Sequence, residues 1–155
     1  MPTRPLIVRT DDVEFEPCVV RTDFSDEAAW QQVLRRLNND PVRSTDLPAA
    51  AVVDDPAFDG ATVEEVLAAF AADDSPAVFF VADAVTMRGE QPLLAVKVPD
   101  DEDDDGFVEP TRDQPFRLLP ETVLSVHGNL TVANMDFEDY GPSDDDPTTY
   151  VYRGL

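Results

Sequence analysis

The sequence has a single cysteine, Cys18, a single histidine, His127, and a single lysine, Lys97, among its 155 residues. One cysteine allows no disulfide within the chain and excludes a four-cysteine zinc site. No apolar stretch approaches the roughly 20 residues that a membrane-spanning helix needs, and the first residues lack the apolar core of a signal peptide. These absences predict a cytoplasmic protein that does not bind a membrane.

Motifs for nucleotide binding and for nucleophilic catalysis are also absent. The six glycines form neither a phosphate-binding loop nor a dinucleotide fingerprint, and no Gly-x-Ser-x-Gly turn is present. The sequence therefore suggests no cofactor and no catalytic residue. His127 as a general base beside Cys18 is one arrangement that stays open, but a buried structural role for both side chains is the simpler interpretation.

The dominant feature is an excess of acid, with 33 Asp and Glu against 11 Lys and Arg and a formal net charge of −22. A small domain stays dispersed with only about 2–8 units of net charge. The surplus creates a negative field that repels nucleic acid and anionic lipid and attracts cations or a basic protein. We expect no direct binding to nucleic acid. Adaptation to high salt would leave a similar composition, so that alternative remains open.

The acids concentrate in two segments, 100–106 and 142–147, which we expect to be acidic loops. A pair after the apolar stretch at 51–53 adds to them. The candidate partner-binding residues are Asp100, Asp101, Glu102, Asp103, Asp104, Asp105, Asp144, Asp145, Asp146, Asp54 and Asp55. A solvated loop without a partner is the plain alternative for each segment.

The first of these loops reproduces half of a calcium-binding pattern. Asp101, Asp103 and Asp105 alternate before Gly106, as in the first half of an EF-hand loop. The twelfth position, however, is Arg112 instead of a bidentate glutamate. The sequence therefore does not identify metal ligands, and it favours, at most, weak binding of divalent cations.

The pattern of apolar residues predicts strands that alternate with helices. Strands are expected at 6–11, 18–23, 51–53, 77–82, 93–98, 116–119 and 150–152, and helices after Ser25, Thr62 and Pro120. Ser25 and Thr62 are the expected N-caps, and Gly128-Asn129 could divide the last helix. We predict one α/β domain over residues 1–155, layered, with a mixed β-sheet and about three helices.

Several segments resemble a known family. The matching stretches are Val20 to Trp30 (VRTDFSDEAAW), Asp55 to Gly60 (DPAFDG), Asn129 to Tyr140 (NLTVANMDFEDY) and Tyr152 to Leu155 (YRGL). They resemble small acidic actinobacterial proteins grouped as a domain of unknown function. The resemblance implies a single cytoplasmic domain, without an assigned reaction, cofactor or catalytic residue.

The polar residues in these stretches predict a buried network. Arg21, Asp23, Asn129, Asn134 and Asp136 lie at the ends of core elements, where buried polar groups need hydrogen-bond partners. We expect such a network to join the strand at 19–24 to the last helix. A structural role of this kind is at least as well supported by the sequence as a binding site.

These observations favour an acidic protein-binding module that neutralises a basic partner. The nearest functional class is an immunity protein or an antitoxin-like inhibitor of a basic toxin, including one that mimics nucleic acid. The alternatives are a salt-adapted housekeeping or enzymatic domain of unknown reaction, and a weak binder of divalent cations.

Overall fold

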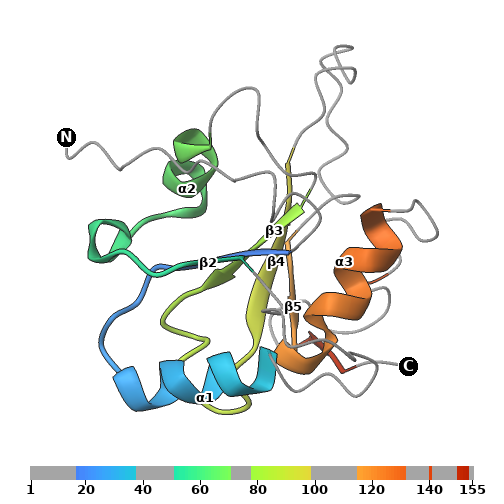
Figure 1. The fold of residues 1–155 in the computed structure, drawn as a ribbon, viewed down its shortest axis with the longest axis horizontal. Helices are drawn as coiled ribbons and strands as arrows, with labels where there is room; N and C mark the ends of the chain where they lie inside the picture. The colour runs from blue at the N-terminus through green and yellow to red at the C-terminus, as the bar shows by residue number, and fades with distance from the viewer. Residues whose placement is uncertain are drawn as a thin grey trace.

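A mixed sheet of six strands, in the order β2-β1-β3-β4-β5-β6, forms the centre of the protein (Figure 1). The computed structural model describes residues 17–37, 51–70, 78–98, 115–131, 140 and 150–153. The strands are β1 (Cys18–Arg21), β2 (Ala51–Val53), β3 (Val78–Ala82), β4 (Leu93–Lys97), β5 (Phe116–Leu118) and β6 (Val151–Tyr152). The helices are α1 (Glu27–Leu37), α2 (Val63–Ala69) and α3 (Val123–Thr131), with 3₁₀ turns η2 (Pro56–Phe58) and η3 (Pro120–Thr122).

The directions of the strands place most of their carboxyl ends on the same side of the sheet. β1 is parallel to β2 and β3, and β5 is parallel to β6. β4 is antiparallel to both of its neighbours, β3 and β5. All the strands except β4 therefore end at the same side of the sheet, which we call the carboxyl edge. The mixed α/β sheet predicted from the sequence is confirmed.

Two apolar clusters cover the two faces of the sheet. On one face, α1 and α3 pack against alternate residues of the strands, including Val19, Phe80 and Leu93. On the other face, α2 and η2 cover Val20, Phe79 and Val81. Burial on both faces explains why β3 is apolar throughout, because each of its residues contacts one of the two clusters.

The order of elements also creates a topological switch point. The chain leaves β1 through α1 to form β2 on one side, then returns through α2 to form β3 on the other side. In open α/β sheets, ligands commonly bind beyond the carboxyl ends of strands at such a point. Here that position lies at the end of β1, next to Arg21, Thr22 and Asp23.

Most element boundaries agree with the sequence patterns, with two corrections, and the strand expected at 6–11 lies outside the described residues. α1 is capped by Asp26 and not by Ser25: the Asp26 carboxylate accepts a hydrogen bond from the Ala29 amide, and its carbonyl accepts the first bond of the helix. Ser25 instead donates its hydroxyl to Asp23. In the last helix, α3 passes through Gly128 to Thr131 without a break, because helical backbone bonds tolerate an internal glycine.

Candidate functional site

Arg21, the last residue of β1, is the centre of the candidate site. Its side chain is only 3% exposed although it carries a permanent charge. The guanidinium carbon lies 4.2 Å from the centre of the Phe24 ring and 5.0 Å from that of Trp30. Both distances are within the range of cation–π attraction. The two rings shield the cation from water, so its polar atoms depend on partners within the protein.

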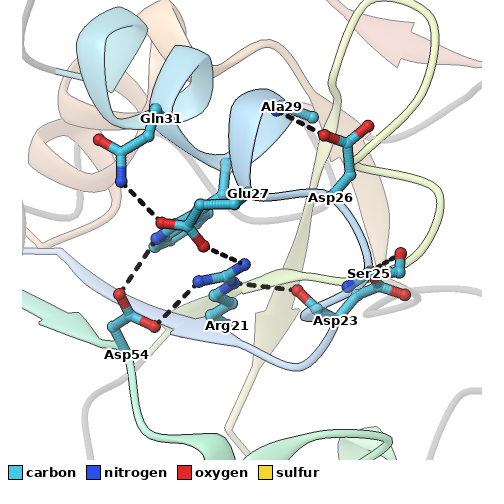
Figure 2. Close-up of polar contacts among 9 residues, drawn as sticks. Arg21, Asp23, Ser25, Asp26, Glu27, Ala29, Gln31 and Asp54 are labelled. Carbon is cyan, nitrogen blue, oxygen red and sulfur yellow. Dashed lines mark hydrogen bonds and ion pairs between the residues drawn. The ribbon is translucent and has the colours of Figure 1, made fainter.

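Three elements supply those partners (Figure 2). The Arg21 Nε donates to the Asp23 carbonyl at 3.0 Å, and Nη1 donates to Asp54 Oδ1 at 3.2 Å. Nη2 forms an ion pair with Glu27 Oε2 at 2.9 Å. A buried cation is tolerated where opposite charges and acceptors surround it. Arg21 therefore joins the end of β1 to the segment after β2 and to the first turn of α1.

Asp54 has a structural role in this arrangement that the sequence alone does not reveal. One of its oxygens accepts from Arg21, and the other accepts from the Trp30 indole Nε1 at 3.2 Å. Its side chain is still 43% exposed. Because each carboxylate oxygen can accept two hydrogen bonds, the outer side of Asp54 can also bind a donor from another molecule.

Six acids gather around this point at the carboxyl ends of β1 and β2. We call them the acidic edge cluster: Asp23, Asp26, Glu27, Asp54, Asp55 and Asp59. All of them are exposed except Asp23, which is half-buried. Within the described segments at this end of the sheet, Arg21 is the only cation, so the cluster has a strong net negative charge.

Hydrogen bonds fix several of these carboxylates and the turn at Asp59. Asp23 accepts from the backbone and hydroxyl of Ser25, and Asp55 accepts from the Ala57 amide as the cap of η2. The turn at Asp59 is held by Gly60, whose amide donates to the Thr22 carbonyl at 2.8 Å. Gly60 has a φ of +76°, which only glycine adopts without strain. The cluster is therefore an ordered set of oxygen acceptors.

The same contacts stabilise the charged form of Glu27. A hydrogen bond from the Gln31 amide and then the Arg21 guanidinium lower the pKa of Glu27 below its ordinary value of 4.5. Glu27 therefore remains ionised at every pH near neutrality.

The structure places two of the acids selected from the sequence, Asp54 and Asp55, in this cluster. The other candidates, at 100–105 and 144–146, lie outside the described residues, as does the half EF-hand pattern at 101–106. Sequence reasoning missed Asp26 and Glu27 as parts of the site, because acids in the first turn of a helix are also favoured by the helix dipole alone.

The polar network that we expected between the strand at 19–24 and the last helix stays a prediction, although the buried Arg21 does have polar partners. The described partners of Arg21 belong to the β1–α1 connection, to α1 and to the segment after β2. Asn134 and Asp136, which we expected to take part, lie outside the described residues. Their contribution stays a prediction.

The sheet separates Cys18 from His127. Cys18 is 1% exposed in the cluster on the α2 face, as expected for a small buried side chain. His127 is 4% exposed on α3 and packs against Phe80 on the opposite face, with ring centres 6.4 Å apart. The two side chains therefore cannot act as a nucleophile and its base.

In the portions of the chain that can be described, no group of three or more His, Cys, Asp or Glu residues is arranged to hold a metal ion. No described helix is both long and apolar enough to cross a membrane.

Comparison with known proteins identifies the family. No curated protein and no solved structure matches the chain. One family model does, a domain of unknown function named DUF6924, and its match covers residues 16–155. This range contains all four of the stretches on which the resemblance was based. The chain therefore belongs to the DUF6924 family.

Proposed function

We propose that this protein is an acidic protein-binding module that neutralises a basic partner, and that the acidic edge cluster forms part of the contact surface. The observation that carries the proposal is the convergence of two exposed carboxylates from separate segments, Glu27 at the start of α1 and Asp54 after β2, on the buried Arg21. The nearest functional class is an immunity protein or antitoxin-like inhibitor. Within that class, the partner would be a basic toxin.

The order of the cluster supports this function. Binding a partner restricts side chains, which costs about 0.5–1.5 kcal/mol for each flexible side chain that becomes fixed. Glu27 and Asp54 are already held by Arg21, and Asp55 is held by its capping bond. A lysine or arginine of the partner would therefore meet carboxylates that lose little further freedom.

The net charge supports it through the rate of association. A protein with a formal charge of −22 attracts a basic partner over a distance of about 8–10 Å at moderate ionic strength. Such steering raises the association rate more than the affinity. The acidic segments at 100–105 and 144–146 would add to this field wherever they lie.

Two matched double variants test the role of the cluster. Asp55→Asn with Asp59→Asn changes the cluster, whereas Glu64→Gln with Glu65→Gln changes the first turn of α2. Each pair changes the net charge by the same amount, and Asn can still cap η2. We expect wild type, immobilised for capture from cells of the source organism, to retain a basic protein at low salt. The cluster variant should bind that protein more slowly than the α2 variant.

The outcomes separate the proposal from its alternatives. Equal slowing in the two variants would show that only total charge matters, which contradicts a role for the cluster. Capture of no basic protein at low or physiological salt would contradict the proposed function. A third variant, Asp101→Asn with Asp103→Asn and Asp105→Asn, tests the first acidic loop. An unchanged association rate in that variant would remove the loop from the contact surface.

A further inference from the structure

A separate groove of about 400 Å³ opens on the carboxyl edge. One wall is the connection between β3 and β4, with Val85, Arg88, Glu90 and Pro92. The other wall is formed by Val151 of β6 and by Arg153, which follows it. In the strand order, the acidic cluster lies at the ends of β1 and β2, whereas the groove lies between the β3–β4 connection and the outermost strand β6.

The charge of the groove is opposite to that of the protein as a whole. Arg153 forms an ion pair with Glu90, and Arg117, which lies beside Val151 in the sheet, binds both oxygens of Asp83 at 2.8 and 2.9 Å. Arg88 uses its Nε to donate to the Ala84 carbonyl at 3.3 Å. No carboxylate within the described ranges is paired with Arg88. The described residues that line the groove therefore have one positive charge in excess.

The walls around this charge are apolar. Val85 is 47% exposed, and it is one of two large apolar residues in the described segments that are classed as exposed. The buried Pro92 lies in the same wall, and the half-buried Val151 lies in the opposite wall. An exposed apolar surface beside an uncompensated guanidinium suits a ligand with an anionic group and an apolar body.

The groove is preformed because its loop is held rigidly. Thr86 is fully buried, and its hydroxyl donates to the Pro92 carbonyl at 2.8 Å and accepts from the Asp83 amide at 3.1 Å. Gln91 has a φ of +62°, an unfavourable value for a side chain of its type. Its amide nitrogen compensates by donating to the Ala29 carbonyl at 3.2 Å and to Gln32 at 2.8 Å, both on α1.

We propose that this groove binds a small organic carboxylate whose apolar body lies on Val85, Pro92 and Val151 and whose carboxylate pairs with Arg88. The volume lies within the range of about 300–1,000 Å³ that is typical of small-ligand sites. The planar guanidinium matches the two oxygens of a carboxylate. A single excess positive charge also fits a monoanion better than a phosphate dianion.

Titration of the full chain followed by NMR tests the ligand class. Hexanoate is the probe. Acetate lacks the apolar body, 1-hexanol lacks the carboxylate, and inorganic phosphate lacks both. We expect hexanoate to shift the methyl signals of Val85 and Val151 at millimolar concentration, with the three controls weaker by about tenfold or more. Equal binding of acetate or of phosphate would show a plain anion site, and equal binding of hexanol a plain apolar site. Either result would overturn the proposal.

Variants with opposite expected effects test the geometry. Arg88→Gln should weaken hexanoate binding by about tenfold, whereas Arg35→Gln, an exposed arginine on α1, should not change it. Glu90→Gln should tighten binding, because it removes a carboxylate that lines the groove and repels the carboxylate of the ligand. Glu64→Gln is its control for net charge. Unchanged binding in Arg88→Gln, or equal tightening in the two glutamate variants, would refute the site.

Discussion

Replacing Asp54 with alanine is the most direct test of how the acidic cluster is held. The substitution removes the acceptor of two buried donors, the Arg21 Nη1 and the Trp30 indole Nε1. Neither donor has access to bulk water, since the Arg21 side chain is 3% exposed and Trp30 is fully buried. We therefore expect a large loss of stability from an acid that the sequence alone places in a solvated connection.

The magnitude follows from the two lost hydrogen bonds. A bond to a charged group contributes about 1.5–3 kcal/mol and a neutral one about 0.5–1.5 kcal/mol. Because Asp54 is partly exposed, water can replace some of this interaction after the substitution. We expect the free energy of unfolding to fall by about 2–3 kcal/mol in Asp54→Ala. Asp54→Asn, which retains one carbonyl acceptor, should lose about half as much.

The assay is urea unfolding followed by tryptophan fluorescence. Trp30 is the only tryptophan in the chain and is bonded directly to Asp54, so its emission reports the site itself. A double-mutant cycle with Arg21→Ala isolates the pair, and we expect a coupling of about 1–2 kcal/mol between the two residues.

Asp55→Ala is the matched control, because it removes the neighbouring acid and only the cap of η2. It should cost about 0.5–1 kcal/mol. The reasoning fails if Asp54→Ala costs no more than Asp55→Ala. A coupling to Arg21 below about 0.5 kcal/mol would equally show that the ion pair does not hold the cluster.

Three further predictions concern other parts of the fold. Burial alone would raise the pKa of Asp83, but its bonds from Arg117 and Thr86 bring it below the ordinary value of 3.8. The unfolded state therefore binds the proton more tightly, and this stabilisation is lost as the pH falls through the folded pKa. Asp83→Asn should flatten the decline in unfolding free energy between about pH 5 and about pH 2, and an equally steep decline would contradict the assignment. Cys18 is 1% exposed, so a thiol reagent should label it only through opening, at a rate that rises with urea; rapid labelling without urea would be inconsistent with its burial. Gln91→Leu and Gln91→Gly both lose the two donated bonds, but only leucine is strained at a φ of +62°. Gln91→Leu should therefore be less stable in thermal unfolding than Gln91→Gly by about 1 kcal/mol, and the reverse order would show that backbone strain is negligible.

The regular elements could be predicted because each leaves a local signal. The apolar stretch at 77–82 gave β3, and the spacing of Trp30, Val33 and Leu37 gave the buried face of α1. The capping pattern at Thr62 and Glu65 is also present, since the Thr62 hydroxyl accepts from the Glu65 amide. Strand order could not be predicted, because it depends on contacts between residues far apart in the chain.

The candidate site could be predicted only in part, because it too depends on contacts between residues far apart in the chain. Asp54 was selected as an exposed acid, but its bonds to Arg21 and Trp30 span 33 and 24 residues. The groove could not be predicted from the sequence, because it depends on Arg88 and Arg153, which lie in different loops and match no motif. The left-handed conformation of Gln91 gave no signal either, because the residue that usually adopts it is glycine.

Helix α1 links the acidic edge cluster to the loop of the groove. Its N-terminal turn, which favours negative charge, contacts the cluster, and its C-terminal turn, which favours positive charge, contacts the loop. Its first turn carries Glu27 beside Arg21, and its last turn carries Arg36, which bonds to the Glu90 carbonyl and to Gln91 in the groove loop. A helix favours anions at its N-terminus and cations at its C-terminus, by about 0.3–1 kcal/mol each. That contribution is smaller than the cost of leaving Arg21 buried without its acids, which is about 3–5 kcal/mol for a buried charge. The specific contacts of Arg21 therefore fix the acidic end, and the helix dipole only reinforces the separation of charge along the edge.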